Sequence, residues 1–427
     1  MGRGEMKIGI IGGGGAGLAA AWLLQENHEV TLFEKLDFLG GHADTVEIEQ
    51  DGETCLIEAG FEFFYERLFP RFNRLLSLIG APIHTYSLSA TLYSADQHRV
   101  TLFPPYARER IIWSAYNPRA LVDLALIQYV IWRSLPLIDK ADPFITLENY
   151  LNSLNLPERF LNHCLYPFLL AEWCVELDEF KTFSAYNALK YMVTSRPKSL
   201  LGTITGYEVV GGMRAYIAAL ANALTRTRIQ LKADITSITH ADNRYTLHDT
   251  NSGDHDFDHM IIATNANKAS RLLQSLRGEE KRRAELDRIE YFTTTIAVHE
   301  DRRLMPANVD HWSVVNTRWQ GIHSSNTVWK KWKSKKPIFR SWVTFDSELP
   351  ANLHLVRTYQ HPKVNLNYFR AQRSLIAQQG ENNLWLAGLY MHDIDCHESA
   401  LTSAINIAGA LDPQSRNLAR LMTAPSA

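Results

Sequence analysis

Five glycines within six residues, between Gly12 and Gly17, constrain this chain more than any other feature. Inside an export signal or membrane helix, each glycine would cost about 0.8–1 kcal/mol relative to alanine, and the apolar run is too short and too interrupted to span a bilayer. A turn between a buried strand at 7–11 and a helix at 18–25 accounts for all five glycines. The spacing Gly12-x-Gly14-x-x-Gly17 is the fingerprint of a turn that binds the pyrophosphate of a dinucleotide.

The residues that follow the turn support this interpretation. A second apolar strand is expected at 29–33, and it ends in Glu34. An acid about 20 residues beyond the glycines accepts hydrogen bonds from the adenosine ribose hydroxyls. Since strand, glycines, helix, strand and acid follow in order, we expect a Rossmann-type unit rather than a glycine-rich turn that binds nothing.

Composition narrows the class of protein. The chain has 427 residues, of which 46% are hydrophobic, so it can bury a large core in two domains. A formal net charge of −2 argues against a nucleic-acid binder. Its four cysteines form no metal-ligand spacing and no C-x-x-C pair, which is typical of a reducing cytoplasm. We expect a cytoplasmic protein without a metal site.

The order of predicted elements indicates a discontinuous nucleotide domain. Features of a phosphate site recur at Gly211-Gly212-Met213, and a buried strand at 258–264 ends in small residues. Residues 110–187 lack strand punctuation and are expected to be mainly helical. Further strands are expected at 45–49, 56–61, 229–231, 245–247, 293–298, 341–345 and 383–388, and helices at 73–79, 214–224 and 399–411.

These elements predict an α/β fold with two domains. Residues 1–85, 200–270 and 380–427 would form the Rossmann-type domain, and residues 86–199 and 271–379 a substrate domain with a mixed sheet and helices.

A set of ordered motifs carries a resemblance to a known family. Five residues separate Glu34 from Gly40-Gly41, and the chain ends with Leu386-Ala387-Gly388 followed by His397-Glu398. With the Gly-Gly-Met segment, this order resembles the FAD-dependent amine oxidase and phytoene desaturase superfamily.

Within that superfamily, one bacterial branch of predicted FAD oxidoreductases shares further motifs. His361-Pro362, Ala371-Gln372 and a W-x-A-G…H-E ending resemble that branch. The chain is also similar to the flavin domain of plant cyclopropane fatty acid synthases and to polyunsaturated fatty acid double-bond isomerase. The resemblance implies FAD as the cofactor.

The resemblance also implies which residues contact FAD. The glycine turn and Glu34 would hold the ADP half, and Ile235 would contact the adenine. Gly388 would lie along the ribityl chain. The amides of the closing helix would point at the flavin pyrimidine oxygen, because a helix N-terminus stabilises the anionic reduced ring. The full set expected to contact the cofactor is Gly12, Gly14, Gly15, Ala16, Gly17, Glu34, Lys35, Gly40, Gly41, His42, Gly60, Phe61, Ile235, Ala263, Gly388, His397, Glu398 and Ala400.

Two departures from the amine oxidase pattern bear on catalysis. Cys396 stands where those enzymes place an aromatic wall of the amine cage, and Asp395 stands where glycine is usual. His42 stands where many relatives have arginine, and the charge of a histidine at neutral pH depends on its surroundings. No catalytic residue can be assigned; the candidates are His42, Tyr390, Cys396 and His397, with Cys396 either a reactive thiol or a small loop residue.

Four further segments allow more than one interpretation. His392–Glu398 resembles a metal cluster but is expected to face the flavin. Residues 254–259 are expected to form a solvated hairpin loop. The apolar stretch 120–132 is either a core helix or a lipid-facing helix that admits an apolar substrate, and the stretch 329–336 is either a solvated turn or an anionic-membrane contact.

We therefore predict an FAD-dependent oxidoreductase that transfers hydride to or from a small lipophilic substrate. Desaturation and double-bond isomerisation of an unsaturated acyl chain both fit. The alternatives are an amine or amino-acid oxidase that uses oxygen, revived by an amine cage built from Tyr390 or Phe61, and a non-catalytic flavin-binding partner of a lipid-modifying enzyme. Peripheral membrane contact is compatible with the sequence, and the oligomeric state is open.

Overall fold

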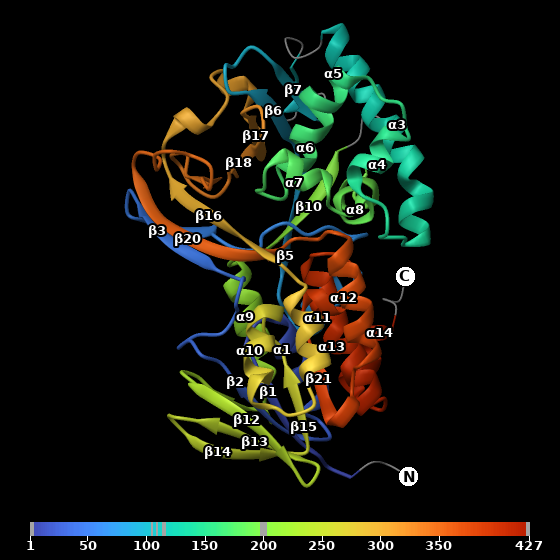
Figure 1. Ribbon diagram of the computed structural model, residues 1–427. Coiled ribbons are helices and arrows are strands. Elements are labelled where there is room, and N and C mark those ends of the chain that lie inside the picture. Colours follow the sequence, from blue (N-terminus) through green and yellow to red (C-terminus); the bar gives the residue numbers. More distant parts are fainter. Residues whose placement is uncertain (1–3, 104–105, 108–109, 113–116, 197–202, 424–427) are drawn as a thin grey trace.

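The computed structural model describes residues 4–103, 106–107, 110–112, 117–196 and 203–423. Its elements form two halves, seen one above the other in Figure 1. The lower half contains a parallel sheet with helices, and the upper half a mixed sheet flanked by helices. This is the α/β architecture predicted from the sequence.

The parallel sheet has five strands in the order β11-β2-β1-β15-β21. Their bounds are Arg228–Gln230, Glu29–Phe33, Lys7–Ile11, His259–Ile262 and Leu384–Leu386. The first strand pairs in parallel with β2 and β15, and four of its five residues are buried because elements cover both faces. All five strands come from the three segments predicted for the nucleotide domain.

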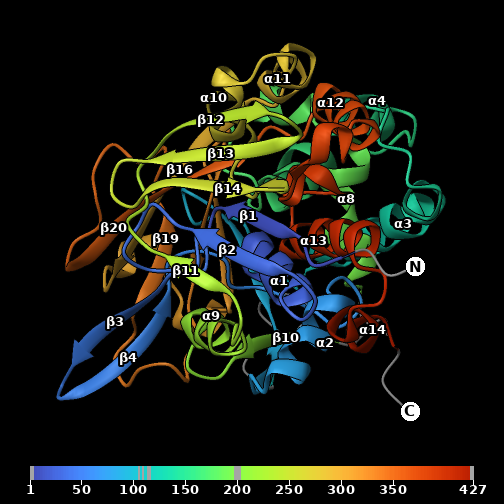
Figure 2. The same cartoon turned by 90° about the horizontal axis from the view of Figure 1, so that it is seen from below.

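Two layers cover this sheet. On one side lies the antiparallel sheet β12 (Ile235–Ala241), β13 (Arg244–Asp249) and β14 (Gly253–Phe257); Figure 2 shows it and α1 (Gly15–Leu24) on opposite sides of β1 and β2. The helices of this half also include α2 (Pro70–Ile79), α9 (Met213–Asn222), α10 (Ala266–Leu272), α11 (Glu280–Asp287), α12 (Leu366–Ala377), α13 (His397–Leu411) and α14 (Arg416–Met422).

The upper half is built on a seven-stranded sheet in the order β20-β16-β19-β18-β17-β6-β7. Only β17 and β6 pair in parallel. The bounds, in that order, are Leu353–Pro362, Tyr291–His299, Phe339–Trp342, Ser324–Val328, Val315–Trp319, Ala90–Ser94 and Val100–Phe103.

Helices flank one end of this sheet (Figure 1). They are α3 (Pro118–Lys140), α4 (Leu147–Asn152), α5 (Glu158–Phe160), α6 (Tyr166–Leu170), α7 (Leu177–Lys181) and α8 (Ala185–Thr194). The mainly helical region predicted at 110–187 is confirmed, apart from residues 113–116, which lie outside the described residues.

Two antiparallel pairs join the halves. β5 (Ile83–Leu88) pairs with β10 (Ile204–Val209), and β3 (Thr45–Gln50) with β4 (Glu53–Glu58). A short pair of strands, Tyr106–Ala107 and Arg110–Ile111, lies beyond β7. The cores of the two halves are continuous, since one cluster of buried apolar residues includes members of α1, α8 and α13.

The prediction of a hairpin loop at 254–259 is wrong for most of that segment. Residues 254–257 belong to strand β14, and the turn precedes them. Cross-strand partners compensate for the low strand propensity of the acids: Thr246 donates to Asp256 at 2.7 Å, and the Nδ1 atom of His248 lies 2.8 Å from Asp254. The sequence predicted a loop because the residues on the exposed face of this strand are acids.

Candidate functional site

The glycine turn after β1 is sterically closed to side chains. A Cβ at Gly12 would lie 2.5 Å from the carbonyl oxygen of Ala263, and one at Gly17 would collide with the carbonyl oxygen of Gly12. Gly12 also has a φ of +114°, which L-residues with a side chain rarely adopt. The fingerprint glycines therefore allow β1, α1 and β15 to approach closely.

A cradle without side chains lies at the start of α1. The amide of Gly40 donates to the carbonyl of Gly13 at 2.9 Å, and a Cβ at Gly41 would meet only the Cα of Gly14, at 3.4 Å. No described side chain caps α1, and its first turn contains no acid. The first amides of this helix are thus free for an anion, and the backbone can approach a pyrophosphate closely, so the donor set fits a dinucleotide.

Glu34 closes the second side of the cradle. Its carboxylate accepts from the amide of Gly13 at 2.7 Å and from that of Leu36 at 2.9 Å. Its carbonyl accepts from the amide of Ala233 at 2.9 Å, which brings the half-buried Ile235 at the start of β12 toward this edge. Lys35 is exposed beside it.

The closing segment of the chain reaches the same place. A Cβ at Gly15 would lie 3.2 Å from Nε2 of His397 and closer still to its Cε1, so the first residues of α1 and α13 touch. Gly388 has a φ of +145°, and its amide donates to Ser403 at 2.9 Å. No described side chain caps α13. The sequence predicted that the opening turn and the closing helix meet, and this is confirmed.

Glu398 uses its carboxylate for a different helix. Its two oxygens accept from the backbone amides of Arg71 and Phe72, each at 2.9 Å, and so cap the start of α2. Contact of this residue with a cofactor would therefore involve its backbone, as it would for Ala400.

The Gly-Gly-Met segment, in contrast, is not a free phosphate site. The amide of Met213 donates to the carboxylate of Glu58 at 3.0 Å, and that of Arg214 to the hydroxyl of Thr45 at 2.9 Å. These groups already occupy the start of α9. Burial raises the pKa of Glu58 to about 7, although the bonds from Thr45 and Met213 oppose the shift.

The two histidines at the junction are uncharged at neutral pH. Burial lowers the pKa of His42 to about 4, with a further contribution from His361, whose ring stacks on it at 5.8 Å. Burial also lowers the pKa of His397 to about 4, and Phe61 stacks on this ring at 4.8 Å. His42 therefore does not supply the positive charge of the arginine that it replaces.

Gly60 joins His42 to a buried cluster of charges. A Cβ at Gly60 would collide with the carbonyl of His42, and that carbonyl accepts from the amide of Phe61 at 2.8 Å. The carbonyl of Gly60 accepts from Arg340 at 3.2 Å. Backbone and guanidinium together fix this turn.

The same cluster of buried charges shows that the prediction for the stretch 329–336 is wrong in part. In the stretch 329–336, Lys330 is buried and forms ion pairs with Glu62 at 2.8 Å and Glu208 at 3.0 Å. A solvated turn was predicted, and this is correct only for neighbours such as Lys331. Lys330 is therefore unavailable for a membrane contact. Its partners lie on β10 and just after β4, far away in sequence, so spacing alone did not indicate them.

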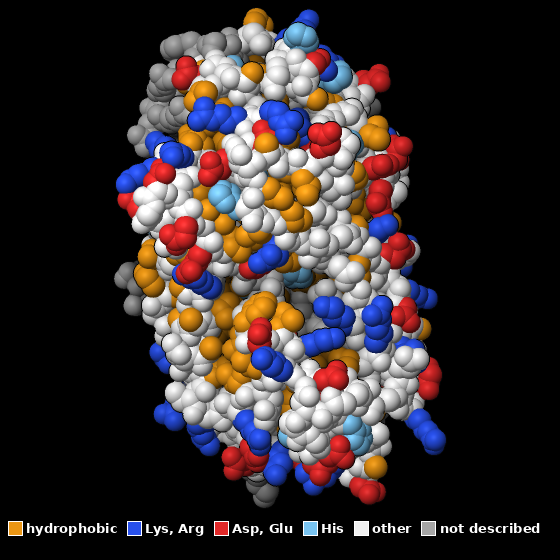
Figure 3. All heavy atoms as spheres, turned by 90° about the vertical axis from the view of Figure 1, so that its left-hand side faces the viewer, with side chains coloured by type: hydrophobic (Ala, Val, Ile, Leu, Met, Phe, Trp, Pro, Cys, Tyr) orange, Lys and Arg blue, Asp and Glu red, His pale blue; other side chains and the backbone are white. Residues whose placement is uncertain are grey.

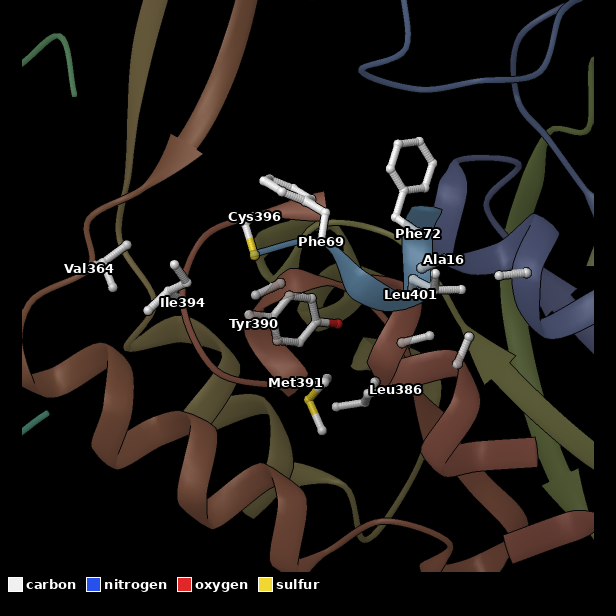
Figure 4. Packing of buried hydrophobic residues seen from close by; sticks show 14 of the residues in the cluster. Ala16, Phe69, Phe72, Val364, Leu386, Tyr390, Met391, Ile394, Cys396 and Leu401 are labelled. Atoms are coloured by element: carbon white, nitrogen blue, oxygen red, sulfur yellow. The ribbon is translucent and has the colours of Figure 1, made fainter. Parts of the chain in front are cut away.

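Figure 4 shows Tyr390, Ile394 and Cys396 on the segment that leads into α13, with Phe69 and Phe72 from the start of α2 nearby. Tyr390 is 1% exposed, so it does not line an open amine cage, although its hydroxyl has no hydrogen-bond partner among the described residues. Burial raises the pKa of Cys396 to about 12. Cys396 is therefore a thiol, not a reactive thiolate.

Helix α8 holds this segment from the upper half. Tyr186 donates to Asp393 at 2.6 Å, Lys190 pairs with the same carboxylate, and Tyr191 donates to the carbonyl of Asp395 at 3.1 Å. These anchors were missed in the sequence, where their spacing along one face of a helix is the only trace of them. Among the described residues, no group of three His, Cys, Asp or Glu side chains is placed to hold a metal ion.

The surface between the two halves is hollowed. Figure 3 shows a hollow at mid-height, with hydrophobic side chains exposed above and below it and Lys and Arg side chains beside it. Leu36 and Phe38, which follow Glu34, are 46% and 53% exposed.

A family model, a curated protein and several solved structures are similar to this chain. A sequence model described as flavin containing amine oxidoreductase matches residues 16–337. An uncharacterized protein of Methanocaldococcus jannaschii is 54% identical over 44 residues, which are 10% of this chain and 11% of that protein.

Three solved structures share the fold over nearly their whole length. A putative protoporphyrinogen oxidase from Exiguobacterium sp. 255-15 is 16% identical with a TM-score of 0.64, covering 97% of this chain and 100% of that one. A CLA-producing fatty acid isomerase from P. acnes is 14% identical with a TM-score of 0.66, over 96% and 100%. A putrescine oxidase variant is 15% identical with a TM-score of 0.67, over 96% and 100%.

Proposed function

Since this chain belongs to the flavin-containing amine oxidoreductase family and is an FAD-dependent oxidoreductase, we propose that it removes hydride from a carbon atom of a lipophilic substrate. The substrate class that we propose is an unsaturated acyl chain, and the reaction either desaturation or double-bond isomerisation. FAD supplies the two-electron acceptor for this chemistry, while the protein supplies position and electrostatics.

The chain offers a group for each part of the cofactor. The free amides of α1 and the glycine cradle suit the pyrophosphate, and Glu34 suits the ribose hydroxyls. The uncapped start of α13 suits the pyrimidine side of the ring, because its amides stabilise negative charge there.

The observation that carries the proposal is that three side chains at the ring site are uncharged. His42 and His397 are neutral imidazoles, and Cys396 is a neutral thiol. An apolar carbon chain binds in such surroundings without leaving a charge unpaired. The small side chain of Cys396 stands at the position of the aromatic amine wall.

Helix α3 supports a substrate that comes from lipid. Two of its polar residues face inward: Asp123 pairs with Arg159, and Ser134 accepts from Tyr150 at 2.9 Å. Among the described residues, α3 is the one helix with the length and composition to cross a membrane, and only 28% of its most apolar window is buried.

The outward face of α3 is apolar with basic neighbours. Leu121, Val122 and Trp132 are 54%, 52% and 63% exposed, and Arg119 and Arg133 are exposed along the same helix. We infer that this face rests on an anionic lipid surface, with the arginines at the headgroups. Cosedimentation with anionic vesicles tests this: Trp132→Ser should weaken binding, and equal binding of both proteins would contradict it.

The compartment that we propose is the cytoplasm, at the inner face of the membrane. All four cysteines are free and buried, as in proteins of a reducing compartment.

Anaerobic reduction of the bound flavin tests the function. The purified protein should be yellow and should release FAD. Unsaturated acyl chains presented in vesicles should bleach it, or should emerge with a moved double bond, and mass spectrometry of the lipid distinguishes the two results. Bleaching by amines alone would replace the proposal with an amine oxidase. A flavin that no substrate bleaches, with unchanged lipid, would favour a non-catalytic flavin-binding protein.

A further inference from the structure

A histidine and a carboxylate meet at the junction of the two halves. His361 is the second-last residue of β20, and Asp395 lies directly before Cys396 at the ring site. The Nδ1 atom of His361 lies 3.7 Å from Oδ2 of Asp395. Within the described part of the chain, no other cation forms an ion pair with this carboxylate. The fold thus joins the end of an upper-half strand to the segment that leads into α13.

Asp395 is held in place by helix α8. Its amide donates to Oδ1 of Asn187 at 3.3 Å, and its carbonyl accepts from the hydroxyl of Tyr191 at 3.1 Å. Its side chain is only 9% exposed, and low exposure strengthens the attraction between its carboxylate and a positive charge nearby. The backbone contacts therefore keep an effective anionic partner beside His361.

The ring of His361 is fixed by stacking on two other rings. Phe292, its cross-strand partner on β16, lies 5.8 Å away with an angle of 26° between the ring planes. His42, which follows Gly41 of the cradle, also lies 5.8 Å away, with an angle of 15°. The imidazole of His361 is therefore oriented from both halves, beside a residue expected to face the flavin.

The second nitrogen of His361 is available to accept a proton. The side chain is 37% exposed, and its Nε2 atom has no hydrogen-bond partner among the residues that the structure describes. Because Nδ1 faces Asp395, the carboxylate favours a proton on Nδ1 and leaves the lone pair on Nε2. The same carboxylate stabilises the imidazolium that forms when Nε2 takes up a proton. This is the arrangement of a general base with an orienting carboxylate.

Four titratable neighbours of the pair keep one charge state around neutral pH. Burial lowers the pKa of His42 to about 4. Burial also raises the pKa values of Tyr291, Tyr359 and Tyr368 above the usual range of a phenol. These groups would not mask the titration of an imidazole beside them. The charged residues that complete the surroundings are Asp44, Lys268, Arg357 and Lys363.

We propose that His361 is a catalytic residue whose Nε2 atom takes up a proton from the substrate carbon next to the one that gives up hydride. Asp395 is its positioning residue, which orients the imidazole and stabilises the imidazolium. This inference rests on the proposed function and narrows it to desaturation.

The proposed step balances in atoms and electrons. One carbon–hydrogen bond of the substrate breaks, and its hydrogen leaves with both electrons to the bound flavin. The carbon–hydrogen bond on the neighbouring carbon also breaks. Its electron pair becomes the new π bond, and its proton forms the N–H bond at Nε2 of His361, from which it passes to water.

The first test compares His361→Gln with His354→Gln. His354 lies at the other end of β20 and has its own carboxylate partner, since its Nε2 lies 3.2 Å from Oε1 of Glu300. Anaerobic flavin reduction by acyl chains is measured against pH on the holoenzymes and expressed per bound flavin. The wild-type rate should rise with pH as His361 loses its proton.

His361→Gln should be slower by about 10²–10⁴-fold and should lose that rise, as expected for removal of a general base. His354→Gln should match the wild type. Equal rates in His361→Gln and the wild type would overturn the inference while leaving the proposed function intact.

Asp395→Asn tests the positioning residue. The backbone contacts with Asn187 and Tyr191 remain, so flavin content should be normal. The imidazolium of His361 loses the carboxylate that stabilises it, and the rise of the rate should therefore move to lower pH. An unchanged pH profile would contradict the role of Asp395.

A further test does not need turnover. Diethyl pyrocarbonate acylates accessible imidazoles, and mass spectrometry identifies the modified residues. Oleate in phosphatidylcholine vesicles should slow modification of His361 several-fold in the holoenzyme, relative to the same vesicles without oleate, and should leave His354 unchanged. If His361 does not react, or reacts equally with and without oleate, it does not contact the substrate and the inference fails.

The products separate failure of the inference from failure of the function. A double bond that moves without net flavin reduction would retain the proposed function as isomerisation and overturn the proton step. If alkylamines bleach the wild-type flavin and acyl chains neither bleach it nor emerge changed, both proposals fail.

Discussion

The glycine cradle and the contacts of helix α8 with the segment before α13 differ in how the chain builds them. The cradle is made by two short segments, 12–17 and 34–41, whose backbone approaches so closely that only glycine fits at several positions. The contacts of α8 join Tyr186, Lys190 and Tyr191 to Asp393 and Asp395, which lie more than 200 residues further along the chain. The cradle is thus concentrated in sequence, whereas the contacts that position the segment before α13 join distant parts of the chain.

Gly17→Ala should have the largest effect, because its Cβ would collide with the carbonyl of Gly12 and displace α1 from the cradle. We expect purified protein with little or no FAD, measured from the absorbance ratio of flavin to protein. Gly409→Ala is the matched control: nothing lies within 4 Å of its Cβ, and alanine inside α13 should stabilise the fold by about 0.5–1 kcal/mol. Normal flavin content in Gly17→Ala would break the distinction between the two regions.

Lys330→Met tests the charged cluster that supports Gly60. Removing the buried cation leaves Glu62 with Arg340 at 3.8 Å and Glu208 with Lys333 at 3.3 Å, and the loss of the buried ion pairs should cost about 3–5 kcal/mol in urea unfolding. Lys331→Met, at the exposed neighbour, should change stability by less than about 0.5 kcal/mol. A similar small change in both variants would show that the cluster does not stabilise the junction.

Tyr191→Phe removes the hydroxyl that binds the carbonyl of Asp395. One such hydrogen bond contributes about 0.5–1.5 kcal/mol. Flavin content should remain normal while the rate of anaerobic reduction falls, because the change loosens the segment before α13 and leaves the cradle intact. Loss of FAD in this variant would show that the two regions are not separable.

Cys396→Ala should have the smallest effect. Burial raises the pKa of this thiol to about 12, so no thiolate is present for alanine to remove. We expect flavin content and reduction rate within about twofold of the wild type, a difference of about 0.4 kcal/mol in activation free energy. A loss of 100-fold or more would return Cys396 to the catalytic candidates.

The parts predicted correctly from sequence share a physical cause. Each of them is specified by its immediate neighbours in the chain. They are a parallel strand buried on both faces, a glycine where two backbone segments approach closely, and an acid after the next strand. The cradle, Glu34 and the helical region of the upper half were therefore foreseeable. The meeting of Gly15 with His397 was foreseeable too, because ordered motifs at the two ends of the chain resembled one family.

Residues whose roles depend on distant partners were misjudged or missed. Lys330 looked like part of a solvated turn because Glu62 and Glu208 are far away in sequence, and the Gly-Gly-Met turn looked like a phosphate site until Glu58 was found bonded to it.

The sequence by itself determined the strand–turn–helix unit, because that unit depends on local backbone sterics, and the ordered motifs that resemble one family implied FAD. Only the tertiary structure decided which carboxylates pair with which cations, because burial and the distance to an opposite charge exist only after the chain has folded.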